Sequence, residues 1–110
     1  MKYIKTYEDS ETDLKKYSVV HIMDSHSLKF GPELYIIEVI KIDRIRNPLQ
    51  VRKLCILHNN GFIHKYEYPP SFDMSHQQLL DATQFVKQSD DFYELLDFLK
   101  TLSDAQKYNI

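Results

Sequence analysis

Five histidines are the residues of this chain whose chemistry most directly suggests a bound metal ion. Zinc prefers three or four nitrogen, sulfur or oxygen ligands at about 2 Å. The candidate ligands are His21, His58 and His64, with Asp24 and His26 as additional groups near the first of them. No HxxxH, HxH or CxxC spacing holds these residues together, so we favour strand histidines with local hydrogen bonds. We therefore expect no metal ion and no other cofactor.

Cys55, the single cysteine, is the candidate thiol nucleophile. A catalytic cysteine needs an adjacent base, and His64 is the candidate. The hairpin register that the sequence favours, with Ile56 opposite His64, places the side chains of Cys55 and His64 on opposite faces of the sheet. No nucleophile elbow is present, and Gly31 and Gly61, the only two glycines, do not form a phosphate-binding loop. We expect a protein that is not an enzyme.

Residues 41–53 carry five basic residues and one acidic residue. If this segment is one hairpin, four cations gather at its tip: Arg44, Arg46, Arg52 and Lys53. Neighbouring tyrosines would then offer stacking surfaces for single-stranded nucleic acid. A solvated turn whose charges prevent edge pairing explains the same residues, and we favour that interpretation.

Eight tyrosines and a set of acidic residues offer surfaces for a protein partner. Exposed tyrosines on a sheet face are favourable anchors, and we nominate Tyr35, Tyr66 and Tyr68. Residues 71–110 hold seven acidic residues and three lysines, a net charge of −4. Within them Asp90, Asp91 and Glu94 are the second set of candidates, although capping of a helix also explains acids at a helix start.

Length and composition limit the class of protein. A chain of 110 residues, 43% hydrophobic and 27% charged, is one ordinary globular domain. A net charge of −2 excludes a strongly basic nucleic-acid binder. No apolar run approaches the roughly 18 residues of a membrane span, and the start of the chain lacks an apolar signal segment. We expect a cytoplasmic protein with no membrane contact.

Four runs have the composition of β-strands: 17–24, 34–45, 51–58 and 62–68. The run 34–45 has apolar residues on both faces, which indicates a central strand covered twice or a strand that bends. Residues 1–16 are expected to form a semi-ordered arm, and residues 17–110 a single domain.

The sequence Asn59-Asn60-Gly61 predicts the tip of a hairpin between the last two strands. A three-residue loop, with Gly61 in the left-handed region, places Ile56 opposite His64 and Leu54 opposite Tyr66. A two-residue loop shifts the pairing by one residue and destroys the apolar face that this register collects. We therefore predict the three-residue loop.

After Pro69-Pro70 the apolar period changes from 2 to about 3.6. Ser75 and Gln78 have the spacing of a capping box at a helix start. The first helix would carry Leu79, Leu80, Ala82, Phe85 and Val86, and the second Phe92, Leu95, Leu96, Phe98, Leu99 and Leu102. The predicted fold is α+β, a four-stranded antiparallel sheet followed by an antiparallel helical hairpin that closes over the apolar face. A small open β-barrel with appended helices is the alternative.

The opening segment Met1–Glu8, the ending Lys107–Ile110, and the bias towards lysine, isoleucine, tyrosine and asparagine resemble small uncharacterised proteins of bacteriophages and other viruses with AT-rich genomes. That resemblance implies a protein that binds a host protein and inhibits or redirects it. The preferred function is therefore protein binding, as an inhibitor or regulator. A second copy of the chain is a further partner that the sequence leaves open.

Nucleic-acid binding through the basic turn is the alternative function, and it makes a separate prediction. Binding to a short oligonucleotide would weaken steeply with salt, because released counterions drive such binding. Alanine at Arg44, Arg46 and Arg52 together would abolish it. Absence of binding at about 50 mM salt would remove this alternative.

Overall fold

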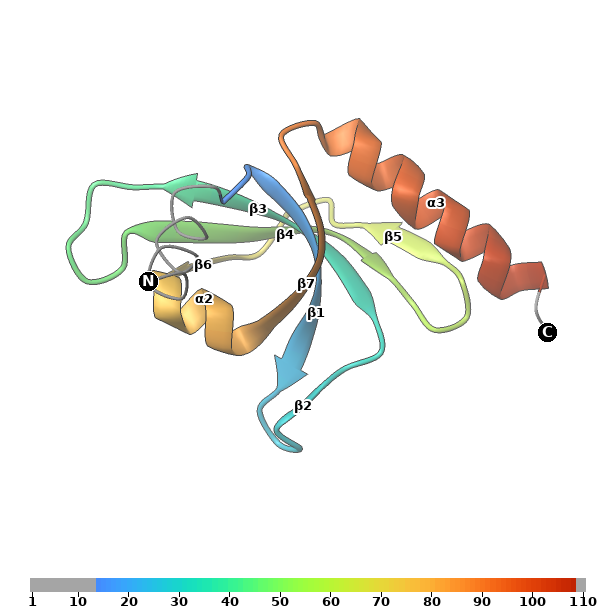
Figure 1. The fold of residues 1–110 in the computed structure, drawn as a ribbon, viewed down its shortest axis with the longest axis horizontal. Helices are drawn as coiled ribbons and strands as arrows, with labels where there is room; N and C mark the ends of the chain where they lie inside the picture. The colour runs from blue at the N-terminus through green and yellow to red at the C-terminus, as the bar shows by residue number, and fades with distance from the viewer. Residues whose placement is uncertain (1–13, 109–110) are drawn as a thin grey trace, which may run out of the picture.

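The computed structural model describes residues 14–108 as an open antiparallel sheet of seven strands with two helices (Figure 1). The elements are β1 (Tyr17–Asp24), β2 (Lys29–Phe30), β3 (Leu34–Lys41), β4 (Leu49–Leu57), β5 (Ile63–Lys65), β6 (Ser71–Met74), α2 (His76–Ala82), β7 (Thr83–Ser89) and α3 (Phe92–Tyr108).

The predicted α+β class is confirmed, whereas the predicted number of strands, four, is too low. Most of the expected arm lies outside the described residues. Neither helix has the length and apolarity needed to span a membrane.

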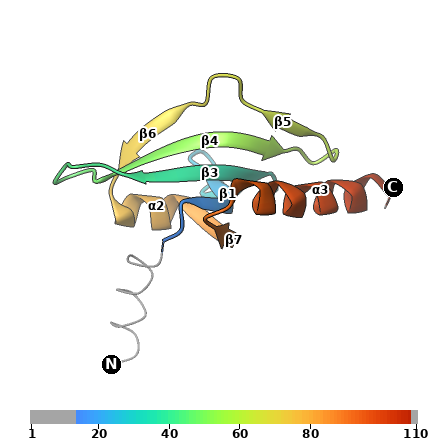
Figure 2. The same cartoon turned by 90° about the horizontal axis from the view of Figure 1, so that it is seen from above.

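The sheet is ordered around β1, β3 and β4. Strand β1 pairs with β7 and β3, and β4 pairs with β3 and then with both β5 and β6. The expected strand 62–68 is therefore shorter than predicted, and β6, which was not predicted, follows it beyond Pro70. Tyr66 donates its N–H to the carbonyl of Leu54 (3.0 Å), and the chain then leaves the sheet. It returns at Pro70, whose carbonyl accepts a hydrogen bond from the N–H of Lys53 (3.0 Å). Figure 2 shows this excursion as an arch between β5 and β6. Pro69 and Pro70 explain the break, since neither has an N–H to donate.

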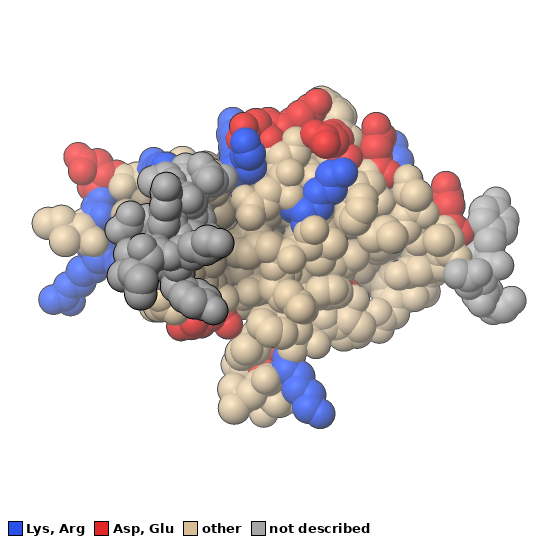
Figure 3. Space-filling model, viewed as in Figure 1, with Lys and Arg blue, Asp and Glu red and all other residues tan. Residues whose placement is uncertain are grey.

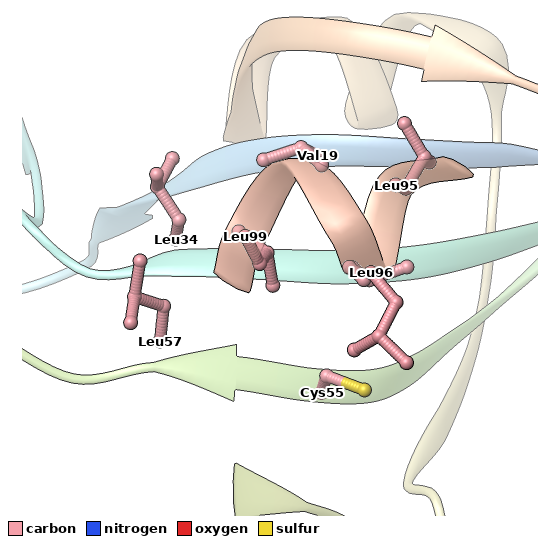
Figure 4. Close-up of a cluster of buried hydrophobic side chains, with 8 residues drawn as sticks. Val19, Leu34, Cys55, Leu57, Leu95, Leu96 and Leu99 are labelled. Carbon is pink, nitrogen blue, oxygen red and sulfur yellow. The ribbon is translucent and has the colours of Figure 1, made fainter. Parts of the chain in front are cut away.

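Both faces of β3 are buried, as its two-sided apolar pattern indicates. Ile36 lies in a cluster with Val19 and Leu99 of α3, whereas Ile37 lies in a second cluster with Val51 and Leu79 of α2. Neighbouring strand residues point to opposite faces, so each helix covers a different face of the sheet. Figure 4 shows the first cluster, in which α3 lies against β1, β3 and β4.

A β-bulge in β4 changes which residues face α3. Ile36 pairs with Cys55 but Ile37 pairs with Lys53, so Leu54 is the extra residue. A bulge of this kind puts two successive residues on one side. Leu54 and Cys55 accordingly both contact the cluster under α3.

The predicted hairpin register is confirmed. Ile56 pairs with His64, and His58 donates its N–H to the carbonyl of Phe62 (2.8 Å) across the three-residue loop. Gly61 has φ of 91°, a left-handed conformation. Its carbonyl also accepts a hydrogen bond from the buried hydroxyl of Ser103, which ties the hairpin tip to α3.

The expected position of the second helix on the sheet is wrong, whereas α2 lies on the predicted face. The prediction placed both helices over the face that carries Ile56 and His64. Instead α3 packs on the opposite face, against Cys55 and Leu57, with Ile63 at its side. The apolar stripe of α3 packs on the face to which the bulge adds Leu54 beside Cys55.

The predicted helical hairpin is also wrong, because residues 83–89 form β7. Ser75 and Gln78 make the expected capping box, but α2 ends at Ala82, where Thr83 has extended angles (φ −134°, ψ 150°). Strand β7 then pairs with β1 along six residue pairs, from Ile22–Thr83 to Tyr17–Ser89. The barrel alternative is not seen either, since within residues 14–108 no pairing joins β7 to β5 or β6.

Replacement of Gly61 by alanine is expected to lower the free energy of unfolding by about 1–2 kcal/mol, because a side chain disfavours its positive φ. Urea unfolding measures this loss. Gly31→Ala is the matched control, since a Cβ there meets only the carbonyl oxygen of Ile22 at 3.6 Å, an ordinary contact. Equal losses in the two variants would contradict the left-handed turn.

Candidate functional site

A shallow open depression of about 440 Å³ lies on the α3 side of the sheet, and we call it the aromatic groove. Its lining is Tyr17, Glu38, Leu54, Cys55, Lys65, Tyr66, Pro69, Phe92 and Tyr93. Three tyrosines, a phenylalanine and a proline make most of its walls aromatic or apolar. Their segments lie far apart in the sequence and meet only in the fold.

One wall of the aromatic groove joins the start of β1 to the start of α3. The rings of Tyr17 and Phe92 meet edge to face with centroids 5.7 Å apart, and Phe92 meets Tyr93 in the same way at 5.5 Å. Asp91 fixes the helix start, since its carboxylate accepts the N–H of Tyr93 (3.0 Å). Tyr93 is nevertheless 71% exposed, so its ring is open to a partner.

The other wall comes from the arch between β5 and β6. Tyr66 is anchored by its backbone bond to Leu54, and its ring packs edge to face on His64 at 5.5 Å. Pro69 completes this wall. Of the three nominated tyrosines, Tyr66 therefore lines the groove. Tyr68 lies nearby on the arch, 85% exposed, outside the lining.

The floor of the aromatic groove includes a buried thiol and a carboxylate that is already paired. Cys55 is buried, and burial raises the pKa of its thiol, an effect that the charge of Lys65 partly offsets. Its thiolate is thus disfavoured at neutral pH. Glu38 is neutralised by two cations, Lys16 at 3.8 Å and Arg52 at 3.5 Å. The groove therefore offers contact surface for non-covalent binding.

The four cations of the expected basic turn do not gather. Arg44 pairs with Asp73 at 2.6 Å, and Arg52 pairs with Glu38 inside the sheet. Lys53 points to the other face, where its ammonium lies over the ring of Tyr35. Arg46 is the one of the four that stays exposed in the loop without an ion pair in the described part of the chain.

The nominated acidic residues mostly serve the fold. Asp90 pairs with Lys15 at 3.8 Å and Asp91 caps α3. Glu94 accepts a hydrogen bond from the hydroxyl of Ser89 at 2.6 Å. All three remain exposed, so their charge still surrounds the start of α3. Figure 3 shows acidic side chains over that end of the molecule, with basic side chains beside them.

Tyr35, the remaining nominated tyrosine, lies on the face opposite the aromatic groove. Burial raises the pKa of its hydroxyl, with smaller contributions from Glu33 and Tyr66. The ammonium of Lys53 lies 5.1 Å from the centroid of its ring. Tyr35 is half-buried, and it is not part of the lining of the groove.

The candidate metal ligands do not form a cluster. His58 contacts the carboxylate of Glu33 at 2.8 Å, and His21 lies 3.1 Å from the backbone carbonyl of the same residue. His64 instead contacts the ring of Tyr66. Within residues 14–108 no group of three or more histidine, cysteine or carboxylate side chains could hold a metal ion.

Sequence reasoning missed most of the aromatic groove. In the sequence Tyr17, Phe92 and Tyr93 are ordinary strand or helix residues, because nothing local shows that the start of β1 meets the start of α3. That meeting follows from the pairing of Tyr17 with Ser89, across most of the chain.

Comparison with protein-family models, with curated proteins and with solved structures returned no match to this chain.

Native Cys55 is expected to react with a thiol reagent such as DTNB at least about a hundredfold more slowly than in urea, because it is 1% exposed and its pKa is raised. Reaction rates at pH 8 measure this. The control is a Cys55→Ser, Tyr68→Cys variant, whose exposed thiol should react equally fast in both conditions. Fast reaction of native Cys55 would mean that the floor of the groove is open.

Proposed function

We propose that this chain is a non-enzymatic protein-binding module and that the aromatic groove is its binding surface. The observation that carries the proposal is the convergence of Tyr17, Tyr66 and Tyr93 around one open depression. Tyrosine is enriched among the residues that contribute most to protein interfaces, because its large ring buries apolar area while its hydroxyl stays hydrated.

The shape of the aromatic groove suits an extended segment of a partner. The depression is shallow and open, with the rings of Tyr17, Phe92 and Tyr93 on one wall, Tyr66 and Pro69 on the other, and Leu54 on its floor. Pro69 and the tyrosines resemble in kind the aromatic-lined surfaces that take extended peptides. Such a segment would place apolar side chains between the walls and keep its backbone in water.

Charge favours a partner that carries basic residues. Asp90 and Asp91 border the Tyr93 wall, and the side chain of Asp90 is 71% exposed. Complementary charge at the edge of an interface increases association rates and selects partners. Nucleic acid instead requires a surface with free basic residues. Two of the cations nominated for it, Arg44 and Arg52, are already paired with carboxylates.

The resemblance to small virus-encoded proteins suggests where the partner is found. We propose that it is a host protein which the module inhibits or redirects in the cytoplasm of the infected cell. A surface without a reactive group, such as the aromatic groove, suits an inhibitor that acts by occupying a site.

The test is affinity capture from an extract of a candidate host, with the wild-type chain and two groove variants, Tyr66→Ala and Tyr93→Ala. The wild type should retain a stoichiometric protein, and Tyr93→Ala should weaken binding by about thirtyfold, the effect of losing about 2 kcal/mol at a central aromatic residue. Tyr68→Ala is the matched control, an exposed tyrosine beside the groove but outside its lining.

Urea unfolding of each variant confirms that the fold is intact. Equal capture by the wild type and both groove variants would exclude the aromatic groove. Loss of capture with Tyr68→Ala alone would move the interface to the outside of the arch.

A further inference from the structure

A second cavity lies on the opposite face of the sheet, beside α2, and we call it the apolar slot. It has a volume of about 190 Å³ and is more enclosed than the aromatic groove. Ile37 and Val51 of the sheet, Phe72 of β6, and Leu79 and Ala82 of α2 form most of its lining. Of the described residues that line it, Lys53 alone carries a charge.

The slot exists because α2 is too short to cover its face of the sheet. The helix has seven residues, and only Leu79 is fully buried. The chain turns directly from Ala82 into β7, so no further helical turn extends over Val51 and Phe72. Among residues 14–108, the space between α2 and β6 is lined by side chains but not filled by any of them, and Leu14 packs on the same cluster.

Lys53 lies at the slot and has no carboxylate partner within residues 14–108. Its ammonium is 5.1 Å from the ring centroid of Tyr35 and 5.5 Å from that of Phe72, and Phe72 also lines the slot. These cation–π contacts hold the charge beside the two rings. Among the ion pairs of residues 14–108 none includes Lys53, whereas its neighbour Arg52 pairs with Glu38 on the other face.

We propose that the apolar slot binds a medium-chain fatty acid, with the hydrocarbon chain between α2 and the sheet and the carboxylate on Lys53. Two observations support this ligand. The lining is apolar except for Lys53 and Thr83, so a hydrocarbon is favoured over a polar metabolite. The unpaired ammonium supplies the complementary charge that one carboxylate needs.

The volume sets the length of the chain. An engineered apolar cavity of about 150 Å³ in another protein binds benzene. The slot, at about 190 Å³, therefore takes an alkyl chain of similar or slightly larger size, such as that of octanoate. Longer chains would extend past the mouth and gain little. This site is independent of the aromatic groove, which lies on the other face.

The test is titration of the full chain, labelled with ¹⁵N, with octanoate and with octanol, which share a chain but differ in charge. Octanoate should bind saturably and shift the amide resonances of Ile37, Val51 and Leu79. It should bind at least about tenfold more tightly than octanol, because only the carboxylate pairs with Lys53. Lys53→Met should remove this preference and leave octanol binding unchanged.

Two control variants distinguish binding in the slot from binding elsewhere on the protein. Lys65→Met removes a lysine of the aromatic groove and should leave octanoate binding unchanged. Ala82→Leu fills the slot and should weaken both ligands. If that variant does not fold, a series from butanoate to dodecanoate with the wild type replaces it, and affinity should rise up to about eight carbons and then level off.

Several results would overturn the proposal. These are equal affinity for octanoate and octanol, affinity that keeps rising with chain length as it does on an open surface, or resonance shifts that centre on Tyr66 and Tyr93. No saturable binding of octanoate would also overturn it. In that case the slot would be left to an apolar side chain of a protein partner.

Discussion

Strand β3 carries isoleucine at two successive positions, and the need to bury both of its faces determines the rest of the structure. Ile36 and Ile37 point to opposite sides, and each is almost completely excluded from solvent. One side is covered by α3, a helix of 17 residues, and the other by α2, a helix of seven. Both cavities lie where this cover ends. The aromatic groove opens at the start of α3, and the apolar slot lies beside α2.

The features that could be predicted from the sequence are those with a local cause. Gly61 after two asparagines predicted a loop of defined length, and that loop determined the pairing of Ile56 with His64. Ser75 and Gln78 satisfy each other's backbone donors within four residues, so their capping box needs no tertiary context. The two-sided pattern of β3 and the apolar stripe of α3 likewise depend on residues close together in the sequence.

The features that could not be predicted depend on contacts between distant residues. Phe85 and Val86 continue the helical spacing of Leu79, yet they form a strand because the edge of β1 needs a partner. The bulge at Leu54 adds one apolar side chain to the face that α3 covers. The aromatic groove combines both effects, since Tyr17 and Phe92 meet through the β1–β7 pairing, whereas Leu54 reaches the floor through the bulge. Of the candidate binding residues, Tyr66 alone was both nominated from the sequence and placed in the groove.

The pairing of β1 with β7 has a consequence for synthesis on the ribosome. Strand β1 is made early, but its partner follows about sixty to seventy residues later. At about 5–20 residues per second, the edge of β1 that pairs with β7 waits several seconds with unpaired backbone donors and acceptors, whereas β3 is made soon enough to pair with the other edge. Val19 and Val20, fully buried in the finished protein, remain accessible during that interval. That interval exposes an apolar strand edge, the kind of surface that makes a folding chain prone to aggregation.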